Sequence, residues 1–201
     1  MDSPPLRLRR SNLTINRRLF NLFDYKPSPL TKPHKNLKSS DVVVVADPSR
    51  NLWFRLYTPT AATTKLPIIV FFHGGGFEVM SAASKPYDDF CQRLAGEIPA
   101  VVVSVNYRLE PEYRYPCQYD DCFDVLKFID DSSLFEGANL EQCFLAWNIA
   151  YHVAIRASGH EFRDLKVVGI LAIQPFFGGE VRTESEKRMK SMPLVNVKRT
   201  D

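Results

Sequence analysis

Three consecutive glycines follow a histidine near the middle of the chain, in the order His73, Gly74, Gly75 and Gly76. They come directly after Leu66–Phe72, an apolar run that predicts a buried strand. Consecutive glycines lose much conformational entropy on folding, which argues against a casual turn. A backbone without Cβ atoms can direct its N–H groups at a closely approaching atom. An oxyanion hole needs such donors, fixed where a tetrahedral intermediate develops negative charge.

Other uses of a glycine-rich loop fit less well. The phosphate-binding patterns G-x-x-x-x-G-K and G-x-G-x-x-G are both absent, and a plain tight turn is the remaining alternative. His73 could act as a catalytic base, but at this position we favour a hydrogen bond that holds the loop in shape. We therefore predict an oxyanion hole formed by His73, Gly74, Gly75 and Gly76, since HGGG is the pattern of this loop in lipases and esterases.

The nucleophile that such a loop would serve is missing from the sequence. The nine glycines stand at positions 74, 75, 76, 96, 137, 159, 169, 178 and 179, so no two are four apart and G-x-S-x-G cannot occur. The last histidine is His160, although the base follows nucleophile and acid in this fold. Ser81, Ser84, Ser104 and Cys143 are other hydroxyls and thiols, but none has an identifiable base. We predict no catalytic residue.

The elements that would position the loop follow an alternating pattern. Continuous apolar strands separated by helices indicate a parallel sheet covered on both faces, that is, an α/β fold. The expected elements are strand Leu66–Phe72, helix Lys85–Glu97, strand Ala100–Val105, helix Gln118–Asp130, strand Cys143–Ala146, helix Asn148–Ala157 and strand Leu165–Ile173.

The preceding residues predict a different arrangement. Apolar residues at helical spacing indicate a short amphipathic helix from Ile15 to Phe23, and prolines then enforce an irregular connection. Val-rich Asp41–Ala46 and Leu52–Thr58 predict an antiparallel hairpin around a turn at 47–51. We expect an N-terminal segment of residues 1–40 and a domain of residues 41–201. A capping box at Thr183–Glu186 predicts one further short helix.

Composition excludes several classes of function. Hydrophobic content of 45% and a net charge of +3 are ordinary for a globular protein. Residues 1–40 carry nine Lys or Arg against two Asp, but these alternate with apolar residues and favour a solvated face over a nucleic-acid site. No apolar run suits a membrane span or a secretory signal, so we expect a cytoplasmic protein. The four cysteines show no C-x-x-C spacing, and we expect reduced thiols and no metal.

Several longer stretches resemble one family. These stretches are Arg50–Leu56, Phe72–Phe77, Val105–Leu109, Tyr119–Asp121, Gln174–Gly179 and Arg182–Glu186. Through them the chain resembles the plant carboxylesterases, in the hormone-sensitive-lipase branch of the α/β-hydrolases, which includes the gibberellin receptors. The resemblance implies an N-terminal helix that acts as a lid, no cofactor, and a small-molecule ester or a hormone-like acid as ligand.

The family's nucleophile turn should follow Cys143–Ala146, but Trp147 stands there and leads at once into Asn148. We expect an incomplete α/β-hydrolase in which the adjoining strand or helix frays, because a strand-to-helix connection normally takes about two to six residues. The sheet should also keep an unprotected edge, giving marginal stability. Three hypotheses follow: an inactive carboxylesterase homologue, an active esterase if the true transcript restores the nucleophile turn and the C-terminal part, and a ligand-binding module resembling the gibberellin receptors.

Overall fold

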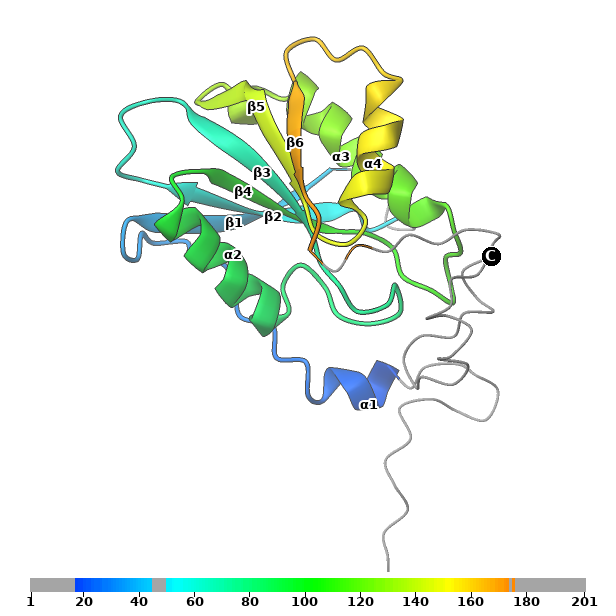
Figure 1. The fold of residues 1–201 in the computed structure, drawn as a ribbon. Helices are drawn as coiled ribbons and strands as arrows, with labels where there is room; N and C mark the ends of the chain where they lie inside the picture. Colours follow the sequence, from blue (N-terminus) through cyan, green and yellow to red (C-terminus); the bar gives the residue numbers. More distant parts are fainter. Residues whose placement is uncertain (1–16, 45–49, 174, 176–201) are drawn as a thin grey trace, which may run out of the picture.

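The computed structural model describes residues 17–44, 50–173 and 175. They form a six-stranded sheet with helices packed against it (Figure 1). The elements in chain order are α1 (Arg17–Asn21), β1 (Leu37–Val43), β2 (Trp53–Pro59), β3 (Leu66–Phe72), α2 (Lys85–Glu97), β4 (Val101–Asn106), α3 (Cys117–Asp131), the 3₁₀ turn η1 (Ser133–Phe135), β5 (Ala138–Ala146), α4 (Ala150–Ser158) and β6 (Val167–Leu171).

The strand order is β1-β2-β4-β3-β5-β6. The pairs β1–β2 and β2–β4 are antiparallel, whereas β4–β3, β3–β5 and β5–β6 are parallel. The predicted hairpin leading into a parallel sheet is therefore confirmed. Because β3, β4, β5 and β6 run in the same direction, their carboxyl ends meet at one edge of the sheet.

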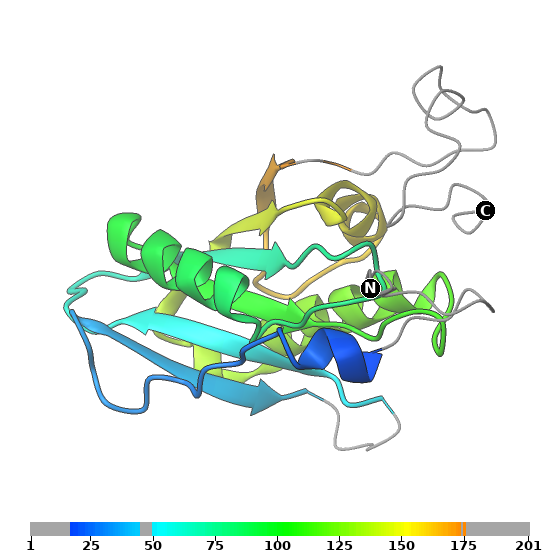
Figure 2. The same ribbon diagram turned by 90° about the horizontal axis from the view of Figure 1, so that it is seen from below.

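The inner strands β3 and β4 are buried on both faces, as their apolar sequences predicted, whereas the edge strand β6 keeps exposed side chains. Along β3, Ile68 and Val70 pack into a core that includes α3 and α4, whereas Ile69 and Phe71 pack into a second core that includes α2. Figures 1 and 2 show α2 on one side of the sheet and α3 and α4 on the other. Alternation of side chains along an extended strand explains how one continuous apolar run serves two cores.

Several predicted boundaries were displaced. The first strand covers Leu37–Val43 rather than Asp41–Ala46, so it begins before the expected division at residue 40. Strand β5 begins at Ala138, five residues before the predicted start, and pairs there with the beginning of β3. The predicted last strand, Leu165–Ile173, is shorter and covers Val167–Leu171. The ends of these strands are set by backbone pairing with neighbouring strands, and a short run of side chains does not specify that pairing.

Near the N-terminus the structure describes one helical turn and a bend, where the sequence predicted a helix from Ile15 to Phe23. The start of that predicted helix, residues 47–49 of the predicted turn at 47–51 and the predicted helix at Thr183–Glu186 lie outside the described residues. Within the described residues, no helix has both the length and the apolar character needed to cross a membrane.

Candidate functional site

The glycine loop and the residue after β5 lie side by side at the carboxyl edge. Strands β3 and β5 are direct neighbours, and Phe71 pairs with Ala146 near their ends. His73 and Trp147 each follow within two residues of that pair, so both leave the sheet at one place. The sheet thereby brings together the predicted oxyanion loop and the position where the sequence lacks a nucleophile.

Left-handed backbone conformations give the glycine loop its shape. Gly75 has φ of 116° and Gly76 has φ of 62°. The N–H groups of Glu78 and Val79 both donate to the carbonyl of Gly75, at 3.2 Å each. A Cβ atom on Gly75 would lie 2.2 Å from the carbonyl oxygen of Val79. Glycine is required at this position for two reasons, because a side chain would be strained by the positive φ and would collide with the backbone.

His73 is buried against the loop, as the sequence predicted for a residue that holds its shape. Its Nδ1 lies 2.8 Å from the carbonyl oxygen of Gly74. A carbonyl can only accept, so Nδ1 carries the proton and Nε2 presents a lone pair. The ring stacks on Tyr107 at 4.3 Å between centroids, and the Tyr107 hydroxyl donates to the His73 carbonyl. Burial lowers the pKa of His73 to about 4, against an opposing effect of the Gly74 hydrogen bond.

Tyr87 reaches the loop from helix α2. A Cβ atom on Gly74 would lie 2.7 Å from the Tyr87 hydroxyl oxygen. Burial raises the pKa of Tyr87, and the hydrogen bond from the Gly74 backbone acts in the opposite direction. No sequence pattern indicates this contact, because residue 87 lies on a helix that the fold alone brings back to the loop.

Trp147 occupies the strand-to-helix turn after β5. It has φ of 96°, and its N–H still donates to the carbonyl of Leu171 at 2.8 Å. Its indole packs on Phe71 and Phe90, with ring centroids 5.1 and 5.5 Å away. Helix α4 begins at Ala150 rather than at the predicted residue 148, so three residues make the connection. A left-handed tryptophan thus makes the turn without fraying of the strand, and the helix gives up two residues.

The alternative nucleophiles are all buried, and two of them, Ser81 and Ser84, are hydrogen-bonded elsewhere. The Ser84 hydroxyl donates to the carboxylate of Asp24 at 2.9 Å, and the Ser81 hydroxyl lies 3.3 Å from that of Ser84. Ser104 is fully buried within β4. Burial raises the pKa of the Cys143 thiol to about 12, which keeps it protonated near neutral pH. The contacts of these four residues give none of them the geometry of a nucleophile paired with a base.

One pocket lies beside this region. A pocket of about 410 Å³ beside the glycine loop includes Arg17, Lys26, Ser81, Tyr107 and Arg108 in its lining. Its cations already have partners: Arg17 pairs with Glu112, Lys26 with Asp24, and Arg108 with Asp121.

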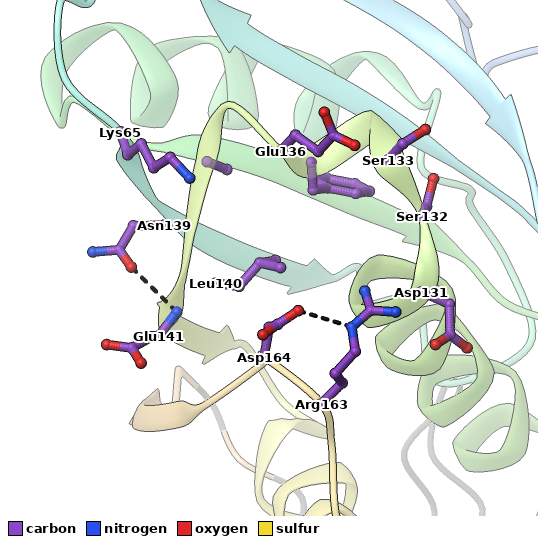
Figure 3. A pocket seen from close by; sticks show the side chains of 12 residues that line it. Lys65, Asp131, Ser132, Ser133, Glu136, Asn139, Leu140, Glu141, Arg163 and Asp164 are labelled. Atoms are coloured by element: carbon purple, nitrogen blue, oxygen red, sulfur yellow. Dashed lines mark hydrogen bonds and ion pairs between the residues drawn. The ribbon is translucent and has the colours of Figure 1, made fainter.

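A larger pocket of about 860 Å³ lies at the opposite edge, where β3 and β5 begin (Figure 3). Its wall carries both signs of charge, and Arg163 pairs with its neighbour Asp164. Lys166 pairs with Glu141 at the same edge. This pocket lies away from the glycine loop. Within the described residues, no group of three or more His, Cys, Asp or Glu side chains is placed to hold a metal ion.

Comparison with known proteins agrees with this architecture. Residues 69–201 match the family model described as alpha/beta hydrolase fold. The chain belongs to the α/β-hydrolase family. It is 41% identical to a gibberellin receptor of Arabidopsis thaliana over 96% of this chain and 61% of the receptor. It is 38% identical to 3-O-acetylpapaveroxine carboxylesterase of Papaver somniferum, over 84% of this chain and 59% of the enzyme.

A further plant relative is matched over more of its own length. Probable carboxylesterase 9 of Arabidopsis thaliana is 34% identical, over the whole of this chain and 69% of its own. Among solved structures, an esterase of Mycobacterium marinum superposes with a TM-score of 0.66 at 26% identity, over 83% of this chain and 52% of the esterase. The expected resemblance to plant carboxylesterases and gibberellin receptors is confirmed. The chain spans 61% and 59% of the first two plant relatives.

Proposed function

We propose that this α/β-hydrolase is a carboxylesterase homologue that does not hydrolyse esters through a serine triad. One observation carries the proposal: Trp147 stands in the left-handed turn between β5 and α4. In α/β-hydrolases that sharp turn presents the nucleophilic serine above the sheet. An indole is no nucleophile, and here it packs onto Phe71 and Phe90.

The expected loss of esterase activity is large. Serine hydrolases that lack triad members keep roughly 10³- to 10⁴-fold catalysis over water, from oxyanion donors and substrate binding. We propose that Gly75 and Gly76 still supply part of such a donor set, with Gly74 and His73 supporting the loop. A second donor normally comes from the residue after the nucleophile. With Trp147 and Asn148 in that turn, we expect turnover to be undetectable above the background of the assay.

The test is an esterase assay on the 201-residue chain with p-nitrophenyl acetate, with and without a serine-directed fluorophosphonate. We expect no burst of p-nitrophenol and a rate that the inhibitor leaves unchanged. Slow release caused by surface lysines would also be insensitive to the inhibitor, so inhibition separates the two cases. Turnover abolished by the fluorophosphonate, with a mass-spectrometric adduct on Ser81, Ser84 or Ser104, would overturn the proposal.

A second candidate is an active carboxylesterase encoded by a longer transcript. The sequence resembles the family on both sides of Trp147, at Cys143–Ala146 and at Asn148–Ala154, which favours this alternative. Sequencing the transcript from this locus decides the matter. Codons for a G-x-S-x-G turn in place of Trp147, with a downstream acid and histidine, would support an active enzyme. A transcript that encodes Trp147 within this context would remove that candidate.

A third candidate is a ligand-binding module, favoured by the similarity to a gibberellin receptor and by the pocket beside the glycine loop. The ligand would be a small hydrophobic acid. Calorimetric titration with a gibberellin, and with benzoate as a small comparator, tests this candidate. Saturable binding that Arg108→Met weakens would support it, whereas no heat with either acid would exclude these ligands.

The described cysteines are free thiols, which supports a reducing and hence cytoplasmic location.

A further inference from the structure

Strand β6 forms one edge of the sheet, next to β5 (Figure 1). Its side chains Val168, Ile170 and Leu171 are 54%, 42% and 44% exposed, and Ile173, just beyond the strand, is exposed as well. Residues 167–173 contain no charged side chain and no proline. An edge strand of this kind presents unpaired N–H and C=O groups beside an apolar surface, and it can therefore pair with a further strand.

The opposite edge of the sheet, β1, is protected in two ways. The Ser39 N–H donates to the carbonyl of Leu30 at 2.9 Å, and the Leu30 N–H donates to the Ser39 hydroxyl at 2.7 Å, so the preceding chain already pairs with the outer side of β1. Lys38 and Asp41 also place exposed charged side chains on this strand, which disfavours pairing with another chain. Within the described residues, no hydrogen bond joins the outer side of β6 to another segment.

The pairing of β6 with β5 determines which backbone groups face outward. The Leu171 carbonyl accepts from the Trp147 N–H at 2.8 Å, so the backbone groups of Leu171 point toward β5. Neighbouring residues of an extended strand direct their backbone groups to opposite sides, so the N–H and C=O of Ile170 point away from the sheet. Two residues directly opposite each other in an antiparallel pair can exchange both hydrogen bonds. Ile170 is therefore placed to be the centre of a pair between two antiparallel copies of β6.

The side chains around Ile170 suit pairing with an identical strand. Ile170 is in register with Leu145, which belongs to the core on the side of α3 and α4. Leu171 is in register with Ala146, which belongs to the core on the side of α2, so exposed apolar side chains lie on both faces of β6. A two-fold axis at Ile170 would set Ile170 against its own copy and Leu171 against Gly169. No like charges would then be opposed, and apolar groups would meet on both faces.

We propose that β6 is the interface of a two-fold symmetric homodimer, in which two copies of β6 pair antiparallel and join two sheets into one. The occupant is a second copy of this chain, because an uncharged edge that is apolar on both faces is complementary to itself. Association stops at two copies, since β1 is already protected. The contact is small beside the roughly 800 Å² per partner of stable complexes, so we expect a dissociation constant in the micromolar range. The dimer is independent of the glycine loop and of the proposed loss of esterase activity.

The first test is sedimentation equilibrium of the 201-residue chain over concentrations that span the micromolar range. It compares Ile170→Lys with Val43→Lys, the matched control, because Val43 is 65% exposed and lies on β1 at the opposite edge. In Ile170→Lys two ammonium groups would face each other across the axis, which is destabilising. The second test is mild oxidation of Ile170→Cys and of Val43→Cys, with the disulfides located by mass spectrometry. Opposite residues of an antiparallel pair have Cα atoms about 5.5 Å apart, which is within the reach of a disulfide.

We expect a monomer–dimer equilibrium for the wild-type chain and for Val43→Lys, and a dissociation constant at least about tenfold higher for Ile170→Lys. Ile170→Cys should form a dimer linked through position 170 faster than Val43→Cys forms one through position 43. A monomer at every concentration would overturn the proposal. So would a dimer that Ile170→Lys leaves intact, because its interface would then lie elsewhere. Association that continues beyond the dimer would show open-ended aggregation and would refute the two-fold pairing.

Discussion

The buried imidazole of His73 predicts a specific dependence of stability on pH. In the folded chain its pKa is lowered to about 4, mainly by burial, from the ordinary value of 6.5. Between these two values the unfolded chain binds a proton that the folded chain excludes. The free energy of unfolding therefore falls as the pH falls from about 6.5 to about 4, and below that this contribution stays constant.

The size of the effect follows from the shift. A difference of about 2.5 units at roughly 1.36 kcal/mol each gives about 3 kcal/mol for this one residue. The steepest change, near pH 5, should exceed 1 kcal/mol per pH unit. Asp124 and Asp130 have lowered pKa values, so their contribution to stability is lost only at more acidic pH, below about 3.8. The pH range in which His73 affects stability is thus separate from that of the two aspartates.

Urea unfolding at pH values from 4.5 to 7.5, followed by the fluorescence of Trp53 and Trp147, measures this slope. The variant His73→Gln removes the titrating group, and we expect it to lose most of the slope even though it is less stable at every pH. His34→Gln is the matched control, because His34 is exposed, and it should retain the wild-type slope. A His73→Gln variant with the same pH slope as the wild-type chain would refute the assignment.

Three further outcomes are expected from urea titrations at pH 7. Gly75→Ala should lower the free energy of unfolding by more than about 2 kcal/mol, because a Cβ there meets a backbone carbonyl at 2.2 Å. Its control is Gly96→Ala, where a Cβ meets nothing within 4 Å, and this variant should be neutral or stabilising by up to about 1 kcal/mol. Arg55→Met should lower the free energy of unfolding by about 3–5 kcal/mol, because it leaves the buried carboxylate of Asp88 without its cation, and a loss below 1 kcal/mol would contradict this. Tyr107→Phe should cost about 1–3 kcal/mol through the unpaired His73 carbonyl, and wild-type stability would show that this hydrogen bond is unimportant.

The sequence specified those parts of the fold that depend on local patterns. Apolar runs located β3 and β4, and the spacing of apolar residues located α2 and α3, because burial on two faces or one face leaves a direct trace in residue type. The start of β5 at Ala138 was missed, since residues 138–142 include Asn139 and Glu141 and lack the continuous apolar run that located the other parallel strands. Their pairing with the start of β3 comes from the sheet and cannot be read along the chain.

The candidate site likewise has parts that the local sequence predicts and parts that it does not. His73 and the glycines were predictable because three glycines in a row are costly unless the backbone needs their conformational freedom. The conformation of Trp147 was not, since a tryptophan with φ of 96° contradicts its own preference and is imposed by the strand before it and the helix after it. Tyr87 reaches the loop from another part of the chain. Such a contact depends on tertiary structure, which local residue patterns do not encode.

The strand order has a consequence for how the chain is made. The strands β1, β2, β4 and β3 are contiguous in the sheet and all lie within the first 106 residues. They include both antiparallel pairs and the central parallel pair, so all four strands of this part of the sheet have been synthesised once residue 106 has left the ribosome. Strand β3 has no neighbour until β4 follows it and pairs with both β2 and β3. The later strands β5 and β6 then add in the order of synthesis, each beside a strand that already exists.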